Sequence, residues 1–215
     1  DCISILHCIV QKVLSKGSKI YCAFIDYEKA FDTINRDALW IKLIKTGISC
    51  KMLKAIYSKV KSCVKNSTNM KFSDFFDVSL GVKQGEPLSP ILFILFINDI
   101  KESLNFQNLT EKDVELLSIY LLLFADDIAL FTTDPNSLQS LLDNVFEYSS
   151  KWGLKINVAK TKICIFEKRK SNHNFDWFIN GTIVGIVDSF VYLGIKFHYT
   201  GNTKYAMQCL HDQSL

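Results

Sequence analysis

The 215-residue sequence has few prolines, few histidines and no long apolar run, and each shortage excludes a class of protein. With three prolines and 48% hydrophobic side chains, the chain is far from the polar composition of disordered proteins, so we expect a folded core. The longest apolar runs, 91–97 and 119–125, are far shorter than the roughly 18 residues of a membrane-spanning helix. The length suits about one domain, and because the chain begins with aspartate we expect it to be a piece of a longer polypeptide.

Signatures of disulfide frameworks and of cysteine or histidine metal sites are also missing. The seven cysteines are an odd number with no Cys-x-x-Cys pair, which argues against both a disulfide framework and a zinc ribbon. The four histidines form no His-Glu-x-x-His motif. We therefore expect reduced thiols and an intracellular location, in the nucleus or the cytoplasm.

The formal net charge of +3 is unevenly distributed along the chain. Eight lysines and no acid lie between Lys42 and Lys71, and seven basic residues face one acid between Lys151 and Lys170. Seven acids face two lysines between Asp99 and Asp127. Solvated helix faces are the simpler interpretation for most of these lysines. Two basic stretches around an acidic centre also suit a polyanion that is held near a metal site.

Apolar spacing predicts helices and strands that intermix along the chain. We expect helices at 2–16, 40–47, 52–60, 91–103 and 135–152. We expect strands at 19–26, 119–125, 128–131, 161–166, 177–179, 182–184 and 190–197, with a hairpin over 64–79. Asn180-Gly181 is a strong signal for a two-residue hairpin turn. The mixture indicates an α/β or α+β protein with one sheet.

Three aspartates stand where apolar strands are predicted to end. Asp26 ends the strand 19–26, and Asp126 and Asp127 follow the run 119–125. Neighbouring carboxylates destabilise a fold unless a cation lies between them, although an exposed Asp-Asp turn is the simpler alternative. If the strands are adjacent, three hard oxygen donors meet at one sheet edge and favour Mg²⁺ or Mn²⁺ over zinc. Two such ions about 4 Å apart support phosphoryl transfer.

The sequence closely resembles the reverse transcriptase family over residues 1 to about 200, because five motifs occur in the family's order. They match motifs A to E and lie at Ala23–Asp32, Gln84–Pro90, Phe124–Asp127, Gly153–Asn157 with Lys160–Lys162, and Tyr192–Gly194. The spellings Phe-Ala-Asp-Asp and Asp-Tyr-Glu-Lys-Ala-Phe-Asp are similar to the LINE-type, non-LTR retrotransposon branch.

The resemblance implies an α+β polymerase palm, with a ferredoxin-like mixed or antiparallel sheet and helices packed on one face. Residues 1–200 would be the palm with a preceding helix, and residues 201–215 a truncated tail leading to a missing thumb. The implied activity is RNA-directed DNA polymerisation, with two-metal transfer of dNTPs onto a primer 3′-hydroxyl. Its partners would be template RNA, DNA primer, dNTPs, and the fingers, thumb and endonuclease domains of a full-length polyprotein. We expect the chain alone to be inactive.

The resemblance also implies roles for individual residues. Asp26, Asp126 and Asp127 would hold the Mg²⁺ or Mn²⁺ ions. Phe31 would exclude a 2′-hydroxyl from the incoming nucleotide, although a core phenylalanine would look the same. Gln84 and Gly85 would contact nucleotide and template, although Gly85 could equally serve only a turn.

Two further roles follow from motifs D and E. Lys160 would protonate the leaving pyrophosphate, with Lys162 as the competing candidate and an exposed strand lysine as the simpler interpretation. The primer grip would begin at Tyr192, Leu193 and Gly194, although a hairpin without this role would have the same sequence pattern.

Three other functions compete with a reverse transcriptase. A noncatalytic nucleic-acid-binding module shares the sheet, but aspartates at its strand ends would repel phosphate in the absence of a metal. An RNA-dependent RNA polymerase shares the palm, but Phe31 argues against it because RNA synthesis must admit the 2′-hydroxyl. An inactive fragment of a decayed retroelement is the third alternative, and the intact aspartates argue against it.

Overall fold

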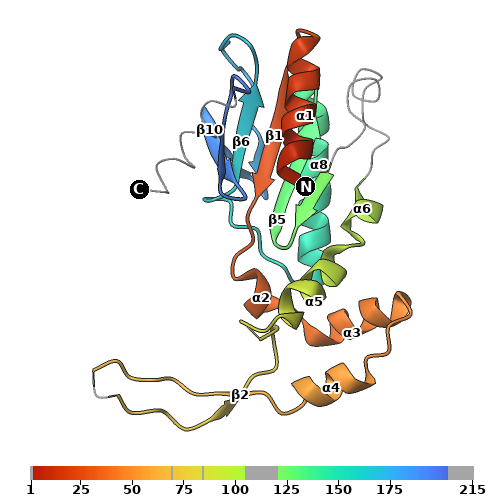
Figure 1. Cartoon of the computed structure of the whole chain (residues 1–215), viewed down its shortest axis with the longest axis vertical. Coiled ribbons are helices and arrows are strands. Elements are labelled where there is room, and N and C mark those ends of the chain that lie inside the picture. Colours follow the sequence, from red (N-terminus) through yellow and green to blue (C-terminus); the bar gives the residue numbers. More distant parts are fainter. Residues whose placement is uncertain (1, 69, 84, 105–120, 203–215) are drawn as a thin grey trace.

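The computed structural model describes residues 2–68, 70–83, 85–104 and 121–202. Within these residues, a five-stranded sheet lies above a group of short helices from which a hairpin extends (Figure 1). In the described part of the chain, no helix is both long enough and apolar enough to cross a membrane. The α+β class expected from the sequence is confirmed.

The central strand of the sheet is β1 (Ile20–Ile25). It lies antiparallel between β5 (Asp127–Thr132) and β6 (Lys162–Phe166), with β4 (Leu121–Phe124) beyond β5. The far edge is β9 (Gly185–Val187), which is parallel to β6 and was not predicted. Three residues flanked by other short segments carry too little periodicity to indicate a strand.

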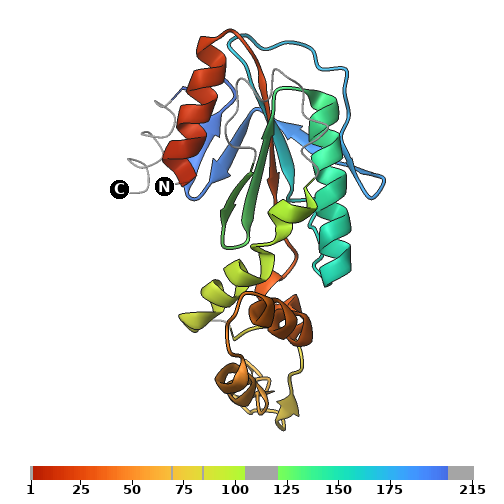
Figure 2. The same ribbon diagram turned by 90° about the vertical axis from the view of Figure 1, so that its right-hand side faces the viewer.

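Both faces of the sheet are covered. Helix α8 (Pro135–Trp152) packs on the face that receives Ala23 and Ile25, and α1 (Cys2–Ser15) packs on the face that receives Cys22 and Phe24. Figure 2 shows the two helices on opposite sides of the sheet. The expectation of helices on one face is wrong in this detail, because β1 is apolar on both sides and each side must be kept from water.

The hairpin of β10 (Ser189–Tyr192) and β11 (Ile195–His198) covers the α1 face together with that helix. The sequence predicts one strand at 190–197, whereas Leu193 and Gly194 have positive φ angles of 50° and 81° and form a turn. The hairpin of β7 (Phe178–Ile179) and β8 (Thr182–Ile183) turns at Asn180-Gly181, as predicted.

The ends of the long helices follow from local chemistry. Helix α1 ends before Gly17, whose φ of +73° lets its amide donate to the carbonyl of Leu14. Helix α8 begins at Asp134, whose carboxylate accepts a 2.8 Å hydrogen bond from the Ser137 amide. Gly153, with a φ of +74°, ends it.

Below the sheet, the described residues between 30 and 97 form what we call the helical lobe (Figure 1). Its elements are α2 (Ala30–Thr33), α3 (Arg36–Lys45), α4 (Lys51–Tyr57), β2 (Lys61–Ser62), β3 (Phe76–Asp77) and α5 (Leu88–Ile97). The buried guanidinium of Arg36 ties the lobe together, because it donates hydrogen bonds to four backbone carbonyls, those of Tyr57, Val78, Leu80 and Gly81.

The helix predicted at 91–103 is two helices, α5 and α6 (Ile100–Ser103). Lys42 explains the break. Its ammonium donates to the Phe96 carbonyl at 2.7 Å and to the Asp99 carboxylate at 2.6 Å. The hydroxyl of Tyr148 accepts from the same ammonium and donates its proton to the Asp99 carboxylate at 2.6 Å. The Phe96 carbonyl therefore accepts from the Lys42 side chain where a continuous helix would supply a backbone amide.

Candidate active site

The three aspartates predicted at strand ends lie at one edge of the sheet. Asp26 follows β1, and Asp127 is the first residue of β5. Because Ile25 pairs with Ile128, Asp26 lies beside Asp127. Asp126 occupies the two-residue turn between β4 and β5, because Phe124 pairs with Asp127.

The charges of these carboxylates act on one another. Burial, followed by the charges of Asp126 and Asp26, raises the pKa of Asp127 above its ordinary value. The Oδ2 atom of Asp26 is buried and has no hydrogen-bond partner. Buried carboxylate oxygens are normally satisfied, so this atom is a candidate ligand for a cation.

The donor set fits a small divalent cation only in part. In the described segments, no group of three or more Asp, Glu, His or Cys side chains is arranged so that it could hold a metal ion by itself. Mg²⁺ is commonly bound through one or two carboxylates together with substrate phosphates and water. The lack of a hydrogen bond to Oδ2 of Asp26 and the raised pKa of Asp127 fit that mode of binding.

The backbone of Asp26 is fixed by the segment that precedes β6. Its amide donates to the Thr161 hydroxyl at 3.2 Å, and its carbonyl accepts from the Asn157 amide at 2.8 Å. The Glu28 amide donates to the Lys155 carbonyl at 2.8 Å. The sequence gives Thr161 and Asn157 no role of their own. Their only signal is their place inside the fourth motif.

The two candidate lysines of this segment point to different partners. The exposed Lys160 places its ammonium nitrogen 4.0 Å from Oδ2 of Asp26. Lys162 donates to the carbonyl of Ala159 instead. Of these two lysines, Lys160 is therefore the one that contacts Asp26.

Phe31 contacts both the core and a pocket. Its ring packs against Phe93 with the ring centroids 5.2 Å apart. It also lines an open pocket of about 600 Å³, together with Gly85, Glu86 and Pro87 of the loop before α5 and Ser89 and Pro90 of its first turn. Phe31 and Gly85, predicted as nucleotide contacts, are therefore brought together. The third, Gln84, lies outside the described residues.

The loop after β3 is attached directly to the Phe31 segment. The Val82 amide donates to the Phe31 carbonyl and the Gly81 amide to the Ile34 carbonyl, both at 2.8 Å. Gly81 has a φ of +76°, and a Cβ atom there would lie 2.7 Å from the carbonyl oxygen of Asp32. Only glycine suits this close approach. The sequence marks Gly81 as part of a turn but does not show what it approaches.

The predicted primer-grip residues lie on the α1 face of the sheet. Tyr192 is buried, and its ring centroid is 5.5 Å from that of Phe24. Burial, with smaller contributions from Cys2 and from the charge of Asp127, raises the pKa of Tyr192. The turn at Leu193-Gly194 follows directly.

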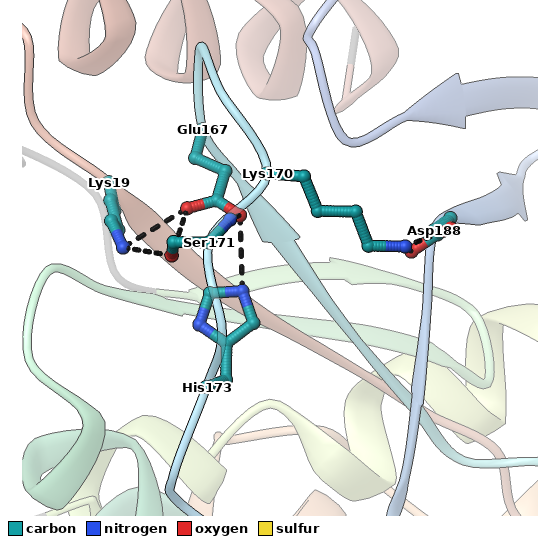
Figure 3. Close-up of polar contacts among 6 residues, drawn as sticks. All are labelled: Lys19, Glu167, Lys170, Ser171, His173 and Asp188. Atoms are coloured by element: carbon teal, nitrogen blue, oxygen red, sulfur yellow. Dashed lines mark hydrogen bonds and ion pairs between the residues drawn. The ribbon is translucent and has the colours of Figure 1, made fainter.

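A buried carboxylate lies at the opposite end of β1 and serves as a contrast (Figure 3). Glu167 accepts a 2.8 Å hydrogen bond from the Ser171 amide and contacts Lys19 at 3.1 Å and His173 at 3.1 Å. Burial alone would raise the pKa of Glu167, but these donors outweigh it and hold the pKa below its ordinary value. This carboxylate is satisfied and holds a loop, whereas Asp26 is not.

Comparison of the sequence with known proteins identifies a family and several relatives. Residues 3–197 match the family described as "Reverse transcriptase (RNA-dependent DNA polymerase)". The chain is 26% identical over 197 residues to a Pol polyprotein of the type-1 retrotransposable element R2 of Popillia japonica, covering 88% of this chain and 32% of that protein. It is 28% identical over 204 residues to the RNA-directed DNA polymerase of the mobile element jockey of Drosophila melanogaster, covering 88% of this chain and 21% of that protein.

Solved structures show the same fold at low sequence identity. Apo telomerase from Candida tropicalis superposes with a TM-score of 0.63 at 18% identity, covering 92% of this chain and 38% of that chain. The likeness confirms the polymerase palm expected from the sequence. The chain spans about a third or less of the two retrotransposon proteins.

Proposed function

This chain belongs to the reverse transcriptase family, and from that premise we propose that it is the catalytic palm of an RNA-directed DNA polymerase from a non-LTR retrotransposon. It would add dNTPs to the 3′-hydroxyl of a DNA primer along an RNA template. The single observation that carries the proposal is the meeting of Asp26, Asp126 and Asp127 at one sheet edge, with Oδ2 of Asp26 buried and without a hydrogen-bond partner.

The aspartates would hold divalent ions, Mg²⁺ in the first place and Mn²⁺ as a substitute. Such ions activate the primer hydroxyl as a nucleophile and neutralise charge on the leaving pyrophosphate. Asp26 contributes the oxygen that has no hydrogen-bond partner, and Asp127 contributes a carboxylate whose ionisation is opposed by burial and by its neighbours. Both features favour a cation at this edge.

Lys160 would donate a proton to the leaving pyrophosphate. Its ammonium group lies beside Asp26, and its exposed side chain can reach a bound triphosphate. A general acid must be within hydrogen-bond reach of the atom that it protonates, and Lys162 is already engaged with a backbone carbonyl.

The pocket beside Phe31 would receive the sugar of the incoming nucleotide. A phenyl ring that is held against Phe93 cannot move aside for a 2′-hydroxyl, so it would favour dNTPs. Gly85 would allow close approach of the backbone, and Gln84 would contact nucleotide and template. The turn at Tyr192, Leu193 and Gly194 would hold the primer end.

The proposal extends to partners and location. The chain would act with fingers, thumb and endonuclease regions of a longer polyprotein, in the nucleus or the cytoplasm, where its thiols stay reduced.

Primer extension tests the proposal. The polypeptide that the gene encodes is supplied with a primed RNA template, Mg²⁺ and either dNTPs or rNTPs. We expect extension with dNTPs, none with Asp126→Asn, and normal extension with Asp143→Asn, which changes an exposed aspartate on α8. A chain that extends no primer, or an active Asp126→Asn variant, contradicts the proposal.

A further inference from the structure

A two-stranded ribbon formed by residues 59–68 and 70–78 extends from the helical lobe, away from the sheet (Figure 1). Lys61 pairs with Asp77 at its base, and Lys65 pairs with Phe72 nearer the tip. The Ser73 amide donates to the Val64 carbonyl at 2.9 Å between these pairs. The ribbon is therefore an ordered hairpin, as the sequence predicts for 64–79.

The ribbon exposes large apolar side chains. Phe72, Phe75 and Phe76 are 66%, 70% and 50% exposed. A two-stranded hairpin with no face packed on a core is marginally stable in water, and exposed aromatic rings lower its solubility without stabilising it. Three exposed phenylalanines within five residues therefore mark a surface that a partner covers.

Two of these rings share a face with two lysines. Four residue steps separate Lys61 from Lys65, but five separate Phe72 from Asp77, so the second strand carries one extra residue, a β-bulge. Directly paired residues lie on the same face, and so do residues two apart in a strand. Lys61, Lys65, Phe72, Phe75 and Asp77 therefore lie on one face. The Lys65 ammonium lies 5.8 Å from the centroid of the Phe72 ring.

The charge of the ribbon favours a polyanion. Its lysines are Lys59, Lys61, Lys65 and Lys71, and its acids are Asp74 and Asp77. Lys61 and Asp77 lie 3.9 Å apart and their charges cancel, so the positive excess comes from Lys59, Lys65 and Lys71 against Asp74. A protein partner for the apolar rings would not need this excess of positive charge.

We propose that this face of the ribbon binds single-stranded template RNA, an inference that rests on the proposed function. Phe72 and Phe75 would stack on unpaired bases, and Lys61 and Lys65 would contact the phosphates between them. Base stacking on aromatic side chains is tolerant of sequence, as a polymerase template requires.

Binding without catalysis tests the inference. A labelled, unstructured RNA of about 12 nucleotides is titrated with the full chain in EDTA and followed by fluorescence anisotropy. We expect the double variant Phe72→Ala/Phe75→Ala to bind about fivefold more weakly or worse, with an unchanged salt dependence. Phe72→Tyr/Phe75→Tyr keeps the rings and should bind like wild type. Phe178→Ala, an exposed ring on β7 outside the ribbon, is the matched control.

The lysines give a second, independent readout. Lys61→Ala/Lys65→Ala should lower the slope of log affinity against log salt by about 0.7 for each phosphate that the ribbon no longer neutralises. An RNA that carries 2-aminopurine should lose its stacking-dependent fluorescence change in the double phenylalanine variant. Unchanged RNA affinity in that variant, or the same loss of affinity in Phe178→Ala, overturns the inference.

Three further outcomes separate this inference from related ones. Tighter binding of a DNA strand of the same sequence overturns the choice of template RNA. A change from dimer to monomer in the phenylalanine variant, with RNA affinity kept, assigns the ribbon to self-association and overturns the inference. If wild type extends no primer but the variant still binds RNA more weakly than wild type, the proposed function fails while the ribbon's role in RNA binding stands.

Discussion

The ammonium nitrogen of Lys160 lies 4.0 Å from the Oδ2 atom of Asp26, although 134 positions separate the two residues in the chain. Backbone hydrogen bonds hold the two segments together, because Asn157 donates to the carbonyl of Asp26 and Thr161 accepts from its amide. The backbone that carries the proposed proton donor is therefore held next to the backbone of the proposed metal ligand.

Lys160→Ala should slow primer extension by roughly 100-fold, the lower range for loss of a general acid. Lys162→Ala should extend primers nearly as fast as wild type, because that lysine contacts a backbone carbonyl away from Asp26. Single-turnover rates with saturating dNTP measure both. Equal losses in the two variants would contradict the assignment of Lys160.

Asp127→Asn should raise the melting temperature of the metal-free protein at neutral pH. Burial and the neighbouring carboxylates raise the folded-state pKa of Asp127 above its ordinary 3.8. The free energy of unfolding of wild type therefore falls as pH rises from 3.8 to the folded-state pKa. The gain from the substitution should vanish below pH 3.8. In calorimetry with Mg²⁺, wild type should gain stability and the variant less. A wild-type chain that Mg²⁺ does not stabilise would argue against a metal site.

Phe31→Val should admit rNTPs far better than wild type, with a smaller loss on dNTPs, because a shorter side chain leaves room for the 2′-hydroxyl. The ratio of kcat/KM for dNTPs and rNTPs measures the change. Phe93→Leu, which removes the ring behind Phe31, tests whether discrimination against rNTPs depends on that packing contact. A folded Phe31→Val variant that still rejects rNTPs would show that another residue excludes the 2′-hydroxyl.

Lys42→Met should change how stability depends on alkaline pH. Burial lowers the pKa of Lys42 to about 8, against 10.5 in the unfolded chain, and the Asp99 carboxylate offsets only part of that effect. Wild-type stability should therefore rise between pH 8 and 10.5, relative to the variant, by up to a few kcal/mol. Urea unfolding across this range measures it, with exposed Lys45→Met as control. Parallel pH curves for wild type and Lys42→Met would show that the ammonium is not desolvated.

The meeting of the aspartates could be predicted because Asp26 follows one apolar run and Asp126 and Asp127 follow another. In the structure β1 is antiparallel to β5, so the end of β1 meets the start of β5 and the turn that precedes it. The proximity of Lys160 to Asp26 could not be predicted. It depends on the conformation of residues 155–161, which no periodicity describes.

Lys42 shows a different limit of sequence reasoning. It lies in a lysine-rich stretch that suggests a solvated face, yet its side chain is 4% exposed. Its ammonium nitrogen lies 3.8 Å from the centroid of the Trp152 ring and also lies over the rings of Phe96 and Tyr148. These aromatic residues come from α5 and α8, so only the tertiary fold brings them to Lys42.

The position of β1 has a consequence for motion at the carboxylates. This strand is hydrogen-bonded on both edges and contributes to the apolar clusters on both faces, so its amides should exchange with deuterium only when the whole sheet opens. Asp26 is attached to this slowly exchanging strand. Asp126 lies in the turn that leads from the edge strand β4 and can open locally. At this edge, Asp26 is therefore held rigidly, whereas Asp126 can move when its turn opens.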